Sequence, residues 1–232
     1  MEQPVLLLTR PRASAERFAG QLDATLISGV DVIISPLVEI TPTKFAVELH
    51  RYSGVVFTSS HAPACMDEGQ GRIAYCVGKR TAQTAELRGW TVALVAETAE
   101  ELVDVLHDPP TPLLHIAGTH RRGEIAQRLT LRGIPTDVAV VYDQVTQPLT
   151  TTARKCLAGS GPVIAPLFSP RTAQIFASQV QNLANVTVIA MSEAVAATLD
   201  GVSIGALQVA VAPTGDEMRR HVENMIRMTT LP

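Results

Sequence analysis

Val55-Val56-Phe57-Thr58-Ser59 is a short apolar run that ends in two hydroxyl side chains. The same pattern returns later in the chain as Ala165-Pro166-Leu167-Phe168-Ser169. Two further matches follow in the same order, 78–82 with 192–196 and 95–98 with 211–214. Matches in one order indicate a duplicated unit. In each copy a strand pattern leads through a polar turn into a helical pattern, and this is typical of α/β proteins.

The rest of the chain continues this alternation of strand and helix patterns. The expected strands are the apolar runs at 5–9, 32–34, 55–58, 73–77, 90–95, 113–117, 137–142, 163–168, 186–190 and 207–211. The expected helices lie at about 14–22, 45–51, 79–88, 99–106, 124–132, 150–157, 170–183, 193–199 and 214–228. Strict alternation predicts parallel sheets that are covered by helices on both faces. About ten strands divide naturally into two five-stranded sheets.

Two extended connectors, at 35–42 and 143–148, leave the division into domains open. A residue that precedes proline avoids the helical region, so Ser35-Pro36 and Thr41-Pro42 predict extended chain. The repeat alone divides the chain into contiguous halves near Pro109. The connectors allow another division, in which the chain leaves the first domain near residue 35 and returns near 147. Repetition does not distinguish between the two.

Composition narrows the class of protein. The chain has 232 residues, 46% of them hydrophobic, with a net charge of −3 and a pI near 6.1, which argues against a nucleic-acid binder. Three cysteines without a C-x-x-C pair predict reduced thiols in the cytosol rather than disulfides or a zinc cluster. No run approaches the ~20 apolar residues that span a bilayer. We expect a cytoplasmic monomer with neither a membrane nor a nucleic-acid partner.

Small, hydroxylated or basic residues follow most of the expected strands. Such turns offer backbone N–H groups at helix N-termini and side-chain donors, which suit carboxylate or phosphate oxygens. A single turn is better explained as a helix cap, because caps favour the same residues. Their recurrence favours an anion-binding cleft between two sheets. The candidate substrate-binding residues are Arg10, Thr58, Ser59, Ser60, Gly78, Thr81, Gly118, Ser169, Arg171 and Ser192.

Other motifs are weaker. Tyr142 ends a β run where the second connector begins, and it is either a packed rim aromatic or a phenol that donates a proton or hydrogen bond. No G-x-G-x-x-G follows a strand and no phosphate loop is present, which disfavours a nucleotide-dependent transferase. His115 and His120 lack a metal-ligand spacing, so we expect no metal site.

Short motifs occur in a fixed order along essentially the whole chain. They are Val5-Leu6-Leu7-Leu8-Thr9-Arg10-Pro11, Val56-Phe57-Thr58-Ser59-Ser60-His61-Ala62, Val77-Gly78-x-x-Thr81-Ala82, Leu129-x-x-Arg132-Gly133 followed by Tyr142, and Phe168-Ser169-Pro170. In order and spacing they resemble the uroporphyrinogen-III synthase family. The resemblance implies an enzyme that cyclises the linear tetrapyrrole hydroxymethylbilane, with loss of water and inversion of ring D through a spiro intermediate. It implies no cofactor and no metal.

The resemblance also implies a domain plan. It predicts two flavodoxin-like domains, each with a five-stranded parallel sheet, joined by a two-strand linker. Domain one would comprise 1–34 and 147–232, and domain two 44–141, with linkers at 35–43 and 142–147. This favours the crossover division over the tandem one.

Individual residues match the family pattern to different degrees. Tyr142 matches a tyrosine proposed to assist departure of the substrate hydroxyl, and Thr81 matches a threonine on the cleft. Thr58-Ser59-Ser60 and Ser169-Pro170 match turns that line it. Val195 departs from the pattern, since the family often has threonine there, whereas Ser192 carries a hydroxyl where the family often has glycine. The alternative is a non-catalytic two-domain module that binds an anionic small molecule.

Overall fold

The computed structural model describes residues 3–120, 124–180 and 182–230. Two compact units divide the chain, unit 1 with residues 1–39 and 146–232 and unit 2 with residues 40–145. The chain therefore leaves unit 1 once and returns to it. Each unit holds one sheet, so the α/β class with two sheets is confirmed.

Unit 1 contains a five-stranded sheet in the order β11-β10-β9-β1-β2. Its strands are β1 (Val5–Leu8), β2 (Asp31–Ile34), β9 (Val163–Leu167), β10 (Leu183–Ala190) and β11 (Ile204–Val209). All neighbouring pairs are parallel. Counted along the chain, the strands follow the flavodoxin-like order 2-1-3-4-5. The order reverses between β1 and β9, and ligands of such sheets bind outside the carboxyl ends of the strands at this switch point.

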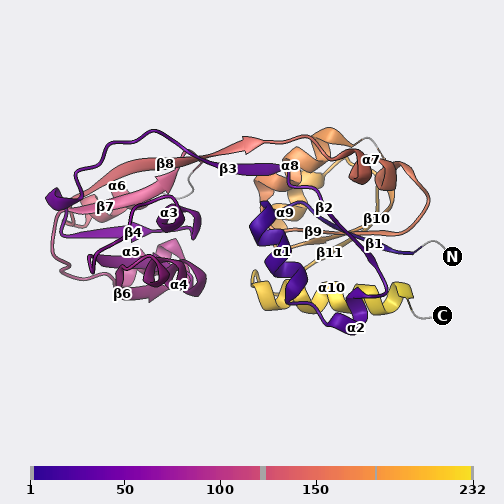
Figure 1. Cartoon of the computed structure of the whole chain (residues 1–232), viewed down its shortest axis with the longest axis horizontal. Coiled ribbons are helices and arrows are strands. Elements are labelled where there is room, and N and C mark those ends of the chain that lie inside the picture. The colour runs from indigo at the N-terminus through magenta and orange to yellow at the C-terminus, as the bar shows by residue number, and fades with distance from the viewer. Residues whose placement is uncertain (1–2, 121–123, 181, 231–232) are drawn as a thin grey trace. The chain divides into compact units, whose positions relative to one another are not determined.

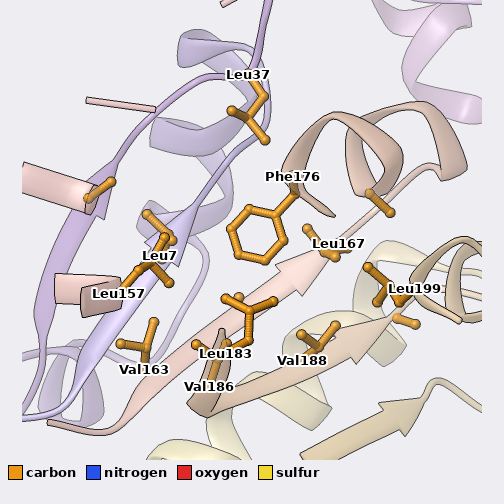
Figure 2. Close-up of a cluster of buried hydrophobic side chains, with 14 of the residues drawn as sticks. Leu7, Leu37, Leu157, Val163, Leu167, Phe176, Leu183, Val186, Val188 and Leu199 are labelled. Atoms are coloured by element: carbon orange, nitrogen blue, oxygen red, sulfur yellow. The ribbon is translucent and has the colours of Figure 1, made fainter. Parts of the chain in front are cut away.

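Helices cover both faces of the unit 1 sheet (Figure 1). Successive β1 side chains point to opposite faces, so Leu7 joins one apolar cluster while Leu6 and Leu8 join another. The Leu7 face is covered by α7 (Thr151–Ala158), α8 (Pro170–Gln179), α9 (Glu193–Ala196) and the 3-10 turn η2 (Ala197–Leu199). The opposite face is covered by α1 (Arg12–Gly20), α2 (Ala24–Ile27) and α10 (Gly215–Thr230). In Figure 2 the Phe176 ring of α8 points into the first cluster, near Leu37 and Leu167.

Unit 2 contains a six-stranded sheet in the order β3-β8-β7-β4-β5-β6. Its strands are β3 (Val38–Pro42), β4 (Gly54–Phe57), β5 (Ile73–Val77), β6 (Thr91–Ala96), β7 (Leu113–Gly118) and β8 (Thr136–Thr146). From β8 to β6 the neighbouring pairs are parallel. Counted along the chain, these parallel strands follow the order 3-2-1-4-5, and the switch point lies between β4 and β7.

This sheet corrects two expectations. A flavodoxin-like order and five strands were expected, whereas the parallel strands follow another order and β3 adds a sixth strand. Gln147 N donates to Leu37 O (2.9 Å) and Thr43 N donates to Val141 O (3.0 Å), so β3 runs antiparallel to β8. The extended connectors pair with each other because this satisfies backbone groups that an isolated edge would leave open. The chain passes between the units within these two strands.

Helices also cover both faces of the unit 2 sheet. Val55 and Phe57 share a cluster with α3 (His61–Ala64) and α4 (Lys79–Leu87). Val56 faces the other way, and its cluster includes α5 (Ala99–Val105) and α6 (Ile125–Leu131). Across the described ranges, no helix has the length and apolarity needed to cross a bilayer.

Two expected helices are shorter than the sequence pattern indicated. Between 45 and 51 only the 3-10 turn η1 (Leu49–Arg51) forms, and Val47 and Leu49 pack against the apolar cluster that contains Val55 and Phe57. The helix expected at 170–183 ends at Gln179 in α8, and β10 already begins at Leu183. The Gln179 side chain bonds both the N–H of Leu149 (2.7 Å) and the carbonyl of Gln147 (2.9 Å), which fixes this end of the helix.

Removing the cap of α5 tests one of these local structures. The Thr98 hydroxyl accepts from Glu101 N (3.0 Å), and the Glu101 carboxylate accepts from Glu97 N (2.8 Å). We expect Thr98→Ala to lower the free energy of unfolding by about 1 kcal/mol, measured by urea denaturation, because a capped donor loses its acceptor. Thr151→Ala, which removes the same atoms from an exposed position of α7, is the control. Equal losses in both variants would contradict the cap assignment.

Candidate functional site

Polar side chains gather at the switch point of unit 2. β4 continues into Thr58, Ser59, Ser60 and His61, and the neighbouring strand β7 ends at Gly118. β4 and β7 are parallel, so their carboxyl ends lie at one edge of the sheet. Gly78 and Thr81 follow β5, the other neighbour of β4, at the same edge. The structure therefore brings the unit 2 candidates together where doubly wound sheets bind ligands.

Tyr142 lies on β8 in register with Gly118 of β7. A Cβ atom added at Gly118 would lie 2.5 Å from Cε2 and Cζ of Tyr142 and 3.0 Å from its hydroxyl oxygen. Only glycine leaves room for the phenol against the β7 backbone. Gly118 was selected from sequence as a substrate ligand, and the structure gives it a further role that sequence did not indicate. The Tyr142 residue is 3% exposed.

The Tyr142 hydroxyl is held by Ser59. The Ser59 Oγ accepts from His61 N (3.3 Å), and its side chain is hydrogen-bonded to the tyrosine. Burial raises the pKa of Tyr142, a side-chain hydrogen bond with Ser59 opposes this rise, and Cys65 adds to it. The phenol therefore stays protonated at neutral pH, and its own O–H is available as a donor.

Several neighbours complete this edge of unit 2. The His61 ring meets the Tyr142 ring edge to face, with centroids 5.9 Å apart. Arg80 Nε donates to Ser60 Oγ (3.1 Å). Thr58 Oγ1 and His115 Nε2 are 3.2 Å apart, which ties Thr58 to a buried histidine on β7. His61 and Arg80 were not selected from sequence, although both stand beside selected residues and carry side chains that suit anions.

Gly78 and Thr81 differ in how open they are. Gly78 has φ +82°, a backbone conformation that favours glycine, and a Cβ added there would meet nothing within 4 Å. Gly78 is half-buried, and its N–H donates to the Ala96 carbonyl (2.7 Å) at the end of β6. Thr81 is buried at 5% exposure in the first turn of α4, and its N–H bonds back to the Gly78 carbonyl (3.0 Å).

Unit 1 has its own polar set at the carboxyl ends of β1 and β9. Arg10 follows β1, and Phe168 with Ser169 follows β9. The Arg10 guanidinium carbon lies 3.9 Å from the centre of the Phe168 ring, which packs edge to face on Phe18 at 5.0 Å. Burial lowers the pKa of Arg10 to about 10, and the like charge of Arg17 adds to this. Sequence did not assign this role to Phe168.

The hydroxyl candidates of unit 1 divide into a capping residue and one that does not cap. Ser169 Oγ accepts from Thr172 N (3.2 Å) and donates to Thr172 Oγ1 (2.9 Å), so Ser169 caps α8. Arg171 lies in the first turn of that helix. Ser192 precedes α9, and its side chain makes no capping bond there. Its hydroxyl is therefore not committed to the helix end.

In the described ranges, neither metal-ligand clusters nor the cavities named below add residues to the candidate site. Within the described part of the chain, no three His, Cys, Asp or Glu side chains gather closely enough to hold a metal ion. A cavity of about 750 Å³ lies between the ends of α7 and α8 in unit 1, and one of about 510 Å³ lies beside β8 in unit 2. Neither is lined by a candidate residue.

Comparisons with known proteins point to one family. Residues 21–219 match the family model described as Uroporphyrinogen-III synthase HemD. A uroporphyrinogen-III synthetase structure from Helicobacter pylori is similar at 18% identity and TM-score 0.67, over 97% of this chain and 100% of that one. A mutant uroporphyrinogen III synthase from the extremely thermophilic bacterium Thermus thermophilus has 13% identity and TM-score 0.55, over 98% and 100%. No curated protein sequence matches. At these identities the two structures establish a shared fold.

Proposed function

Because this chain belongs to the uroporphyrinogen-III synthase family, whose members are cyclising lyases of tetrapyrrole biosynthesis, we propose that it converts hydroxymethylbilane into uroporphyrinogen III. The reaction removes water and closes the macrocycle with ring D inverted. The observation that carries the proposal is the buried phenol of Tyr142, packed on Gly118 and bonded to Ser59 at the switch point of unit 2.

Tyr142 is the proposed donor to the leaving hydroxyl. The pyrrole nitrogen supplies electrons as the C–O bond breaks, the electron pair leaves with oxygen, and the tyrosine proton converts the departing group to water. The hydrogen bond with Ser59 lowers the pKa of the phenol, so it favours the negative charge that develops on the tyrosine oxygen. The raised pKa keeps the phenol protonated until this step. The product is an azafulvenium cation together with water.

Once water has left, the enzyme must control the conformation of the azafulvenium cation. Without a protein the bilane closes to the symmetrical isomer, so an enzyme must favour attack at the substituted carbon of the terminal ring, through a spiro intermediate. Opening of that intermediate and closure at the other carbon invert ring D, and loss of a proton completes the product. This is a task of orientation and electrostatics. No electrons are exchanged with another molecule.

We propose that the protein orients the substrate by binding its carboxylates. The bilane carries acetate and propionate groups on its pyrroles. The hydroxyls of Thr58 and Ser60 in unit 2 are suited to these oxygens, as are Arg10 and Ser192 of unit 1.

Ser59→Ala tests the coupling to Tyr142. Losing one hydrogen bond to the phenol should lower kcat by roughly two- to tenfold, since such a bond contributes about 0.5–1.5 kcal/mol. The sharper result comes from a double-mutant cycle with Tyr142→Phe. If Ser59 acts through the tyrosine hydroxyl, Ser59→Ala will have no further effect once that hydroxyl is gone. Full additivity of the two rate losses would separate Ser59 from the tyrosine.

The proposal as a whole is tested by turnover. Freshly prepared hydroxymethylbilane is mixed with a small molar fraction of the protein, and consumption is followed with time. We expect saturable consumption over many turnovers. Saturable binding without turnover would overturn the proposal in favour of a non-catalytic module for anionic small molecules.

A further inference from the structure

We propose that Arg10, stacked on Phe168 in unit 1, is a preformed seat for one carboxylate of the substrate, and that this cation is retained for binding rather than for folding. The inference rests on the proposed function, because the tetrapyrrole supplies the carboxylate. It adds a specific anchor to a set of donors that are otherwise interchangeable.

The position of the pair is the first argument. β1 leads into Arg10 and β9 leads into Phe168, and these are the neighbouring strands at which the strand order of unit 1 reverses. Ligands of doubly wound sheets bind outside the carboxyl ends of the strands at this point. The Phe168 ring is itself held by its edge contact with Phe18 of α1. The guanidinium is thus fixed by packing and not by a bound acid.

The geometry of the stack is the second argument. With its carbon 3.9 Å from the ring centre, the guanidinium lies over one face of Phe168. Stacking occupies a face of the planar cation and leaves its N–H edge for an acceptor in the same plane. A carboxylate presents two oxygens in such a plane and forms a bidentate pair. The seat therefore selects a planar, doubly accepting anion.

The charge balance is the third argument. Among the described residues, none forms an ion pair or hydrogen bond with the Arg10 side chain. The charge that most affects it is the like charge of Arg17, whose guanidinium donates to Ser14 (3.3 Å). The adjacent Thr9 hydroxyl is also buried without a partner in the described chain. A half-buried cation with no anion nearby is unfavourable for the folded protein, which points to an anion from outside.

Arg10→Met is the direct test, with Arg12→Met as the matched control. Methionine keeps much of the apolar stem and removes the charge, whereas Arg12 is exposed and pairs with Glu16 (3.6 Å). Affinity for uroporphyrin III, which carries the same kinds of carboxylate, should fall roughly tenfold for Arg10→Met and stay unchanged for Arg12→Met. The unliganded Arg10→Met protein should melt no lower than wild type. Unchanged affinity in a folded Arg10→Met protein would overturn the inference, as would a seat filled by inorganic phosphate but not by uroporphyrin III.

A second measurement covers the case in which Arg10→Met does not fold. In the wild-type protein the side-chain ¹⁵Nε–¹Hε signal of Arg10, assigned by its loss in Arg10→Lys, should shift when uroporphyrin III is added. A signal that does not move would overturn the inference. This failure is distinct from failure of the proposed function, because the wild-type protein would still turn over hydroxymethylbilane.

Discussion

Replacing Tyr142 by phenylalanine will slow formation of uroporphyrinogen III by roughly 100-fold or more, which is the range for loss of a positioned proton donor. The phenyl ring keeps its place against Gly118 and His61, so the packing of β8 on β7 is retained. Only the hydroxyl is lost, and its partner Ser59 still accepts from His61 N. The protein should therefore remain folded, with a near-wild-type melting temperature.

The measurement is kcat from the amount of product isomer formed with time, together with thermal unfolding. Tyr52→Phe is the matched control, because it removes the same atom from another tyrosine of unit 2, whose hydroxyl donates to Asp137 (2.9 Å). We expect Tyr52→Phe to leave kcat unchanged. A wild-type rate for Tyr142→Phe would remove Tyr142 from the mechanism.

Gly118→Ala carries the second large expected effect. The new Cβ would lie 2.5 Å from two ring carbons of Tyr142, well inside van der Waals contact. The β7 backbone cannot move away easily, because it pairs with β4 on one side and β8 on the other. The tyrosine ring must shift, and its hydroxyl moves away from Ser59. We expect a loss of kcat comparable to that of Tyr142→Phe and a loss of stability of about 1–3 kcal/mol from overpacking.

Activity and urea unfolding measured on the same preparation separate the two effects of this substitution. Gly20→Ala is the control, since a Cβ added at Gly20 meets nothing within 4 Å. It should leave both the rate and the stability close to wild type. A Gly118→Ala protein with wild-type kcat would show that the close packing of Tyr142 on Gly118 has no bearing on the reaction.

Most strands of this fold are visible in the sequence for a simple physical reason. Central strands of parallel sheets are buried on both faces, so they appear as continuous apolar runs. Val55, Val56 and Phe57 are at most 1% exposed, and β1 is buried along its whole length. The strand order is not visible in this way. Both units repeat the same local pattern, yet one sheet follows 2-1-3-4-5 and the other 3-2-1-4-5, because the order depends on which edge each crossover helix packs against.

Local sequence patterns likewise did not predict that β3 pairs with β8. Val38–Pro42 alternates apolar and polar residues over only four positions before the proline, and its partner strand is a segment about 100 residues away. The helix expected at 45–51 is also wrong, and in the segment that replaces it Val47 and Leu49 pack against the apolar cluster of Val55 and Phe57. Helix propensity is a weak prior that such tertiary contacts override.

The candidate residues show a similar division between local and long-range information. Turns that follow strands lie at the carboxyl edge of their sheet, so the strand pattern predicts that edge for the candidate residues. Grouping Ser59 with Gly118, and Arg10 with Ser169, also required the crossover division that the family resemblance implies. What each residue contacts could not be predicted. The bond between Ser59 and Tyr142 and the stack of Arg10 on Phe168 join distant parts of the chain. Ser169, in contrast, is used by its own helix as a cap.

The isomer composition of the product tests the proposed reaction most directly. Hydroxymethylbilane is incubated with and without the purified protein, the products are oxidised to porphyrins, and the type III and type I isomers are separated and quantified. We expect type III as the main product, formed much faster than the spontaneous type I. Type I alone, at the rate seen without protein, would contradict the proposed reaction.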